Sequence, residues 1–273
     1  MPLAASDDSS LNRHRPAIAA SSGHPRAIAV RLRNSASGVH LDQSSPPSGS
    51  ARTGGAFCCA LRAALVSSSV PQRVVVFLDN QNVYHRARDA FCAPDASASE
   101  GQVDPLALGR LLARRVSGGC LANVRVYRGR PSQRRDSRSY SAYRRQTATQ
   151  ASRGVGLVTV ISRDLRYPPD WPRRAAQEKG IDVALAVDFV MMIARRECDV
   201  GILFSSDTDL VPALEAVLAL RPGSPPACEV AAWAAPCGRP RSLSVRGARI
   251  RRHLLPEADY RVAADPTDYT LLR

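Results

Sequence analysis

The chain has 273 residues, enough for one or two domains, and 38 basic against 24 acidic residues give it a net charge of +14. This excess favours a polyanionic partner, either nucleic acid or an anionic membrane surface. No run of about 18 apolar residues is present to span a bilayer, which weakens the membrane alternative and favours nucleic acid. The alternative source of the charge is a GC-rich gene, because Lys179 is the only lysine among many arginines.

The seven cysteines show no CxxC spacing and no neighbouring histidine, which argues against a zinc site. Their odd number, without a secretory signal at the N-terminus, is typical of reduced thiols. The sequence therefore predicts a cytoplasmic protein.

Three segments of different composition follow one another. Residues 1–70 are rich in Ser, Ala, Pro and Arg and show no sustained hydrophobic periodicity, so we expect them to be disordered. Residues 71–265 carry the pattern of a folded domain, and residues 266–273 form a C-terminal tail.

Short apolar runs alternate with helical patterns through this domain, without internal repeats. We expect strands at 73–78, 121–127, 155–162, 200–204 and, as the last one, 228–234, and helices at 105–115, 131–153, 183–196 and 210–220. Such alternation predicts an α/β fold with a central, mostly parallel sheet flanked by helices.

Aspartates stand where such a fold presents side chains to a ligand. Asp79 ends the first strand, and Asp207 and Asp209 follow the strand at 200–204. Ligands of open α/β sheets bind at the carboxyl ends of the strands. Carboxylates gathered there repel one another unless a cation lies among them, and a divalent metal is the usual solution.

Each aspartate also has a simpler interpretation as a helix cap or turn residue. Asp182 and Asp188 are six residues apart, and on a continuous helix they point roughly 240° apart. They face one site only if Asp182 precedes the helix and Asp188 lies on its inner face. Asp188 has apolar neighbours, where an unpaired carboxylate would be costly.

Metal-assisted hydrolysis of a phosphodiester is the chemistry that suits these carboxylates, because a hard cation prefers oxygen ligands and activates bound water. Arginines interleaved with tyrosines then supply an RNA-binding surface, since arginine binds phosphate and tyrosine stacks on unpaired bases. The alternative is an ordinary solvated helix face. The predicted RNA-binding residues are Arg128, Arg130, Arg134, Arg135, Arg138, Tyr140, Tyr143 and Lys179.

Three motifs resemble those of the NYN domain family, which belongs to the PIN-like metal-dependent ribonucleases. They are the Asp-x-x-Asn motif in 75–84, the Lys-Gly-x-Asp motif in 178–188 and the Ser-x-Asp-x-Asp motif in 204–213. Residues 229–233 and 255–262 also resemble the closing strand and terminal segment of the family. The resemblance extends over roughly 72–265.

This resemblance implies a Rossmann-like fold with an acidic Mg²⁺ or Mn²⁺ pocket and no organic cofactor. It implies that Ser205 contacts a phosphate or carboxylate and that Asp259 fixes the C-terminal segment. Asn80 and Ser206 depart from the family, in which glycine is frequent at both positions. The implied catalytic residues are Asp79, Asp188, Asp207, Asp209 and Asn82, and the implied metal ligands are Asp79, Asp182, Asp188, Asp207 and Asp209.

The sequence thus predicts a metal-dependent endoribonuclease acting on single-stranded or structured RNA. Alternatives are a non-catalytic RNA-binding or regulatory module on the same fold and a nuclease acting on DNA flaps. A phosphatase of the haloacid dehalogenase type is disfavoured, because Gln81 stands where its general acid is required. No membrane partner is expected, and assembly into a homo-oligomer is left open.

Overall fold

The computed structural model describes residues 70–154, 156–223, 227–236 and 240–271. The described residues belong to one compact unit of the chain. The predicted disordered extension over 1–70 lies outside the described residues, apart from Val70.

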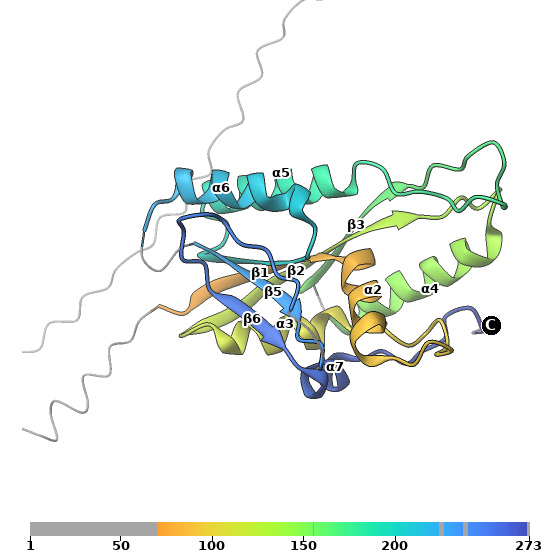
Figure 1. Cartoon of the computed structure of the whole chain (residues 1–273), viewed down its shortest axis with the longest axis horizontal. Coiled ribbons are helices and arrows are strands. Elements are labelled where there is room, and N and C mark those ends of the chain that lie inside the picture. Colours follow the sequence, from red (N-terminus) through yellow and green to blue (C-terminus); the bar gives the residue numbers. More distant parts are fainter. Residues whose placement is uncertain (1–69, 155, 224–226, 237–239, 272–273) are drawn as a thin grey trace, which may run out of the picture. The chain divides into compact units, whose positions relative to one another are not determined.

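A six-stranded sheet forms the centre of this unit, with strand order β3-β2-β1-β4-β5-β6 (Figure 1). All five strand pairings are parallel, which confirms the predicted α/β class. The order reverses between β1 and β4, as in doubly wound folds, where ligands bind at such a reversal. The strands are β1 Gln72–Asp79, β2 Gly119–Arg130, β3 Val158–Asp164, β4 Val200–Phe204, β5 Cys228–Trp233 and β6 Arg252–Leu255.

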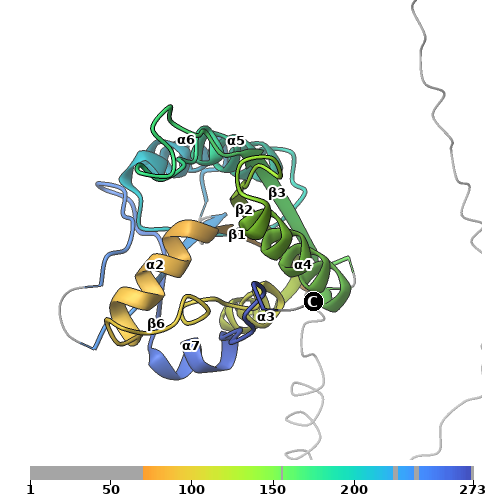
Figure 2. The ribbon, with the colours of Figure 1, turned by 90° about the vertical axis from the view of Figure 1, so that its right-hand side faces the viewer.

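Helices cover both faces of the sheet (Figure 2). Successive residues of β1 point to opposite faces, so Val76 and Phe77 enter two separate cores. Helices α2, α3 and α7 pack on the first core and α5 and α6 on the second, while α4 lies beside α3 along β3. The helices are α2 Asn80–Phe91, α3 Pro105–Arg115, α4 Ser137–Gly154, α5 Ile181–Ala194, α6 Val211–Leu220 and α7 Glu257–Ala263, with the short 3-10 helix η1 Thr208–Leu210 before α6.

Two sequence predictions of the fold are corrected. The helix expected from residue 131 begins at Ser137, because Asp136 accepts a hydrogen bond from the Ser139 amide (3.0 Å) and ends a preceding turn. The strand at 228–233 is not the last one, since β6 and α7 follow it. Only alternate residues of β6 are buried and the strand has four residues, so its apolar signal is weak.

The described helices include none that is both long and apolar enough to cross a membrane. Four cysteines lie within the described ranges, Cys92, Cys120, Cys198 and Cys228, and all four are free thiols.

Candidate active site

An open hollow of about 590 Å³ lies at the carboxyl ends of β1 and β4, where the strand order reverses. Acidic side chains from three parts of the chain line it: the end of β1, the start of α5 with the loop before it, and the turn after β4. We call it the acidic hollow. Its lining residues are Asp79, Gln81, Asn82, His85, Arg86, Ala176, Gln177, Glu178, Asp182 and Asp207.

Asp79 is the most deeply placed carboxylate of the acidic hollow, with 5% of its surface exposed. One oxygen, Oδ1, accepts a hydrogen bond from the Asn82 amide (3.1 Å) and so caps α2, while Oδ2 accepts one from the Ser205 hydroxyl (2.9 Å). Burial raises the pKa of the Asp79 carboxyl to about 6, although both hydrogen bonds act to lower it. Asp79 therefore caps α2, as its simpler interpretation predicted, and also lines the acidic hollow.

Asn82 and Ser205 join the turn after β1 to the turn after β4. The Asn82 amide oxygen accepts hydrogen bonds from the Ser206 backbone N–H (3.0 Å) and hydroxyl (3.1 Å). The Ser205 hydroxyl accepts one from the Asp207 amide (3.0 Å). Ser206, one of the departures from glycine, is thus a structural partner of Asn82. These bonds leave the amide nitrogen of Asn82 as the part of its side chain that is available to a ligand.

Asp182 lies in the first turn of α5, at the acidic hollow. The helix begins after Gly180, whose φ of 75° is in the left-handed region that favours glycine. Partial desolvation raises the pKa of Asp182, and repulsion from Asp207 and Asp209 raises it further. Asp182 therefore lies together with the other carboxylates of the acidic hollow.

Asp188 does not line the acidic hollow, contrary to the role that the resemblance implied. Its Oδ2 accepts hydrogen bonds from the Arg125 guanidinium (2.7 Å) and the Tyr127 hydroxyl (2.8 Å), both on β2. The reason is geometric: α5 is continuous from Ile181, so both aspartates lie on one helix and point in different directions. Asp188 is thus an ion-pair partner within the fold.

Asp207 and Asp209 follow β4 as predicted. Asp207 lines the acidic hollow, and its Oδ1 accepts a hydrogen bond from the Asp209 amide (3.0 Å), which caps η1. Asp209 is exposed within η1 and is not among the lining residues, although its negative charge helps to raise the pKa of Asp182. Asp209 therefore lies at the rim.

Sequence reasoning missed Glu178 and His85 as members of the hollow. Glu178 accepts a hydrogen bond from the Gly129 amide (2.6 Å), and a Cβ on Gly129 would lie 2.9 Å from the same carboxylate oxygen. Burial raises the pKa of Glu178. Glu178 is part of the Lys-Gly-x-Asp segment, and His85 lies one helical turn after Gln81. Helical spacing could have identified His85, but the position of Glu178 depends on β2.

The lining suits a hard divalent cation. In the described part of the chain, Asp79, Asp182 and Asp207 form no ion pair with Arg, Lys or His. Within the same residues, no three Asp, Glu, His or Cys side chains are close enough to hold a metal by themselves. Mg²⁺ usually keeps several waters and binds one or two carboxylates together with substrate phosphate, so the open oxygen-donor set fits it.

The predicted RNA-binding residues are divided among three places. A shallow groove, which we call the basic groove, is lined by Arg130, Arg134, Arg135, Tyr140 and Tyr167 among others. Arg134 and Arg135 are exposed there, and the Arg135 guanidinium lies 5.6 Å from the centre of the Tyr167 ring. Arg130 is paired with Asp164 (2.7 Å).

The remaining predicted RNA-binding residues lie elsewhere. Arg128, Arg138 and Tyr143 line a separate hollow beneath α4. Tyr143 is 9% exposed and donates its hydroxyl to Ser162 (2.9 Å), so it is not a free surface ring. Lys179 is exposed next to Glu178. Asp259 forms an ion pair with Arg115, a contact between α7 and α3 that fixes the C-terminal segment as expected.

The sequence model of the NYN domain matches residues 73–221, from β1 to the end of α6. This chain belongs to the NYN domain family. The matched segment of the NYN domain contains every acidic residue of the hollow. Beyond it, β5 and β6 extend the sheet and α7 follows them. The family is related to the PIN-like nucleases, which are typically dependent on divalent metal ions.

No curated protein matches the chain. Among solved structures, a protein of unknown function from Vibrio parahaemolyticus RIMD 2210633 is similar, with 18% sequence identity over 62% of this chain and 84% of that chain, at a TM-score of 0.39.

Proposed function

We propose that this NYN domain is a metal-dependent endoribonuclease that hydrolyses RNA phosphodiester bonds at the acidic hollow. The observation that carries the proposal is the gathering of Asp79, Asp182 and Asp207, without cationic partners in the described chain, at the point where the strand order reverses. Carboxylates held together in this way are a binding site for a divalent cation and the phosphate that it attracts.

One or two of Asp79, Asp182 and Asp207, together with waters and the substrate phosphate, would hold Mg²⁺ or Mn²⁺, with Asp209 at the rim and Glu178 also in the lining. When bound, such an ion neutralises phosphate charge and lowers the pKa of a water, which becomes the nucleophile. The α2 N-terminus and the Ser205 hydroxyl hold both oxygens of Asp79 in place. Asn82 lines the hollow, and its amide nitrogen, which makes no hydrogen bond within the described residues, would orient a phosphate oxygen or water.

The basic groove would hold the RNA chain beyond the acidic hollow. Arg134 and Arg135 are exposed there, and the Tyr140 and Tyr167 rings offer surfaces on which unpaired bases stack. Lys179, exposed beside Glu178, adds a positive charge next to the carboxylates. Arginine side chains in a groove bind the phosphate backbone without reading sequence, so we expect broad RNA affinity.

The test is cleavage of end-labelled mixed RNA in Mg²⁺ or Mn²⁺ by the full chain and by Asp79→Asn, Asp182→Asn and Asp207→Asn. Each substitution removes one negative oxygen ligand, and we expect the rate to fall by about 10²–10³-fold. Asp188→Asn is the matched control, since it makes the same change on the same helix as Asp182 but outside the hollow.

Metal-dependent cleavage that survives Asp79→Asn and Asp207→Asn would reject the site. RNA binding without cleavage by the unmodified chain, in either metal, would favour the non-catalytic RNA-binding module. Parallel assays on single-stranded and flap DNA distinguish a ribonuclease from a nuclease that also cuts DNA.

A further inference from the structure

The hollow beneath α4, which we call the α4 pocket, is a second ligand site next to the acidic hollow. Its volume of about 490 Å³ is within the range of small-molecule sites. We propose that the α4 pocket binds a single nucleotide of the RNA substrate, the one adjacent to the phosphate held at the acidic hollow. That the nucleotide belongs to an RNA substrate rests on the proposed function. That the α4 pocket binds a nucleotide is argued only from the residues that line it.

The main evidence is the half-buried Arg128, which forms no ion pair within the described residues, although the Glu178 carboxylate is near enough to raise its pKa. Arg128 lines the α4 pocket and donates through Nη1 to the Gln146 side-chain oxygen (2.5 Å), and its guanidinium lies 5.1 Å from the centre of the Tyr143 ring. Its Nε is buried without a hydrogen-bond partner, and burial lowers the pKa of the guanidinium. A buried charge is costly unless it is paired, so an anionic ligand is the natural complement.

The net charge of the lining also favours an anion. Arg138 is the second arginine of the α4 pocket, and Asp268 is its acidic residue. The Asp268 carboxylate is already bound by the Thr270 amide (2.8 Å) and hydroxyl (2.7 Å), which lower its pKa. The α4 pocket is thus lined by two arginines and by one carboxylate that is already hydrogen-bonded to Thr270. Guanidinium groups bind phosphate well, so a phosphate is the anion that we expect.

Aromatic and amide groups extend the site beyond a simple anion hole. The Tyr84 and Tyr143 hydroxyls donate to the Ala98 carbonyl (3.0 Å) and to Ser162 (2.9 Å), so both side chains are held in place while they line the α4 pocket. The Gln146 amide nitrogen donates to Gln102 (2.7 Å). Fixed aromatic rings beside amide side chains match a nucleobase, which has flat faces and a polar edge.

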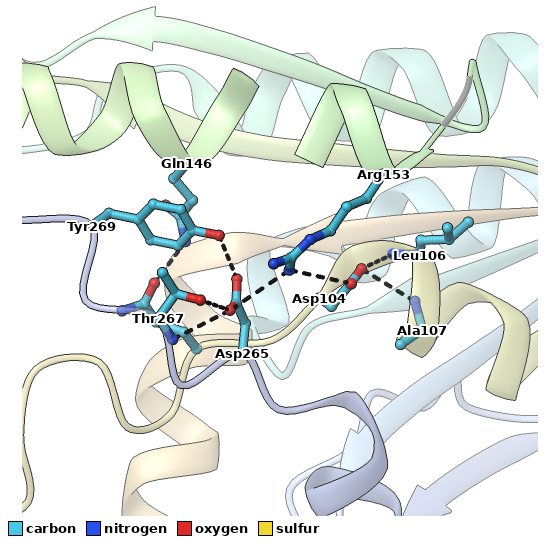
Figure 3. A network of polar contacts seen from close by, with 9 residues as sticks. Asp104, Leu106, Ala107, Gln146, Arg153, Asp265, Thr267 and Tyr269 are labelled. Carbon is cyan, nitrogen blue, oxygen red and sulfur yellow. Dashed lines mark hydrogen bonds and ion pairs between the residues drawn. The ribbon is translucent and has the colours of Figure 1, made fainter. Parts of the chain in front are cut away.

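The C-terminal segment closes one side of the α4 pocket and is anchored firmly (Figure 3). Asp265, 3% exposed, accepts hydrogen bonds from Thr267 (2.7 Å) and Tyr269 (2.7 Å) and lies 3.9 Å from Arg153 of α4. Arg145 of α4 also donates to the Tyr269 carbonyl (2.8 Å). This wall is therefore part of the folded unit, and the α4 pocket is preformed for its ligand.

The two sites lie on either side of the junction between β1 and α2. Asp79 lines the acidic hollow, and the next residue, Asn80, lines the α4 pocket. In the neighbouring strand Tyr127 is in register with Asp79, and Arg128 follows it. A strand of RNA that crosses the start of α2 would therefore meet both sites.

The test is calorimetric titration of the full chain with each of the four nucleoside 5′-monophosphates, with the corresponding nucleosides and with inorganic phosphate. A chelator is present, so the result does not depend on metal or cleavage. We expect at least one monophosphate to bind with a Kd of about 1 mM or tighter, and more tightly than its nucleoside or phosphate.

Arg138→Gln and Arg128→Gln should weaken this binding by about tenfold, because each removes a charge-assisted hydrogen bond. Arg144→Gln, an exposed position on the same helix that does not line the α4 pocket, should leave it unchanged. Asp207→Asn should also leave it unchanged. Arg138 is exposed, so its variant tests the proposal even if the half-buried Arg128 is required for folding.

Failure of all four monophosphates to bind, or equal binding by the unmodified chain and Arg138→Gln, would overturn the proposal. Equal affinity for phosphate and for the monophosphates would show that the α4 pocket recognises only an anion, and the proposal of a nucleotide site would be rejected. If the unmodified chain binds a monophosphate but does not cleave RNA, the proposed function is rejected and the nucleotide site in the α4 pocket is retained.

Discussion

The Ser205 hydroxyl donates a 2.9 Å hydrogen bond to the carboxylate of Asp79, and this bond joins the ends of β4 and β1 at the reversal of strand order. The same hydroxyl accepts from the Asp207 amide. One buried serine therefore positions the central carboxylate and the turn that carries the next one.

Ser205→Ala should lower the free energy of unfolding by about 1.5–3 kcal/mol, because it leaves a buried carboxylate oxygen and a backbone amide without their partner. Urea unfolding in the presence of a chelator measures this change. Ser152→Ala, at an exposed position of α4, is the control and should change stability by less than about 0.5 kcal/mol. Equal effects of the two variants would contradict the role of Ser205.

Asp79 should make the metal-free protein less stable as the pH rises. Its folded-state pKa of about 6 is above its ordinary value of 3.8, so the folded protein binds the proton more tightly than the unfolded chain. The stabilising effect of that proton is complete below about pH 4, is lost as the pH rises to about 6, and is absent above it. Asp79→Asn has no such proton and should gain stability relative to the unmodified chain over this window. Parallel pH–stability curves in chelator would contradict this prediction.

Divalent metal should stabilise the folded chain through the acidic hollow, since a ligand that binds only the folded state raises Tm. Mg²⁺ or Mn²⁺ should raise the Tm of the unmodified chain and of Asp188→Asn, and should raise it much less in Asp182→Asn and Asp207→Asn. Differential scanning fluorimetry with a metal series measures the effect. An equal response by Asp182→Asn and Asp188→Asn would show that the metal binds elsewhere.

Asp188→Asn should lower the free energy of unfolding by about 1–3 kcal/mol while RNA cleavage remains, because it breaks a partly buried pair with Arg125. A double-mutant cycle with Arg125→Gln measures the coupling between the two side chains by urea unfolding. Loss of cleavage in Asp188→Asn at unchanged stability would return Asp188 to the catalytic group.

Replacing Arg134 and Arg135 together with Ala should weaken RNA binding and reduce the slope of log K against log salt by about 2, because two phosphate contacts are lost. Fluorescence anisotropy over a salt series measures the slope. Arg110→Ala, an exposed position on α3, should leave it unchanged. A slope that does not change in the double variant would place the RNA path outside the basic groove.

Residues near strand ends were the best predicted part of the site. The apolar runs before Asp79 and Asp207 are long enough to show as buried strands, and the carboxyl ends of parallel strands lie at one edge of a sheet. The positions of Asp182 and Asp188 were harder to predict, because helical spacing gives the angle between the two side chains but not the residue at which the helix begins. The position of Gly180 and the packing of α5 on β2 determine that Asp182 reaches the hollow and Asp188 meets Arg125.

The surroundings of the arginines could not be predicted from the sequence either. Arg128 and Arg130 are two residues apart on β2, yet Arg128 lies beneath α4 and Arg130 is paired with Asp164 near the surface. Charge patterning along the sequence identified them as one RNA-binding surface. The structure separates them because Gln146 and Tyr143 of α4 contact Arg128, whereas Arg130 is held by Asp164.

The amino-acid sequence by itself determined the α/β class, the order of most elements and the aspartates that follow β1 and β4, because hydrophobic periodicity and strand ends are local properties. Only the tertiary structure decided which charge each side chain meets. Glu178 lines the acidic hollow and is hydrogen-bonded to Gly129, Asp188 forms an ion pair with Arg125, and Arg128 lies half-buried beneath α4, where its side chain contacts Gln146 and Tyr143. These outcomes depend on contacts between residues far apart in the chain, which no local pattern encodes.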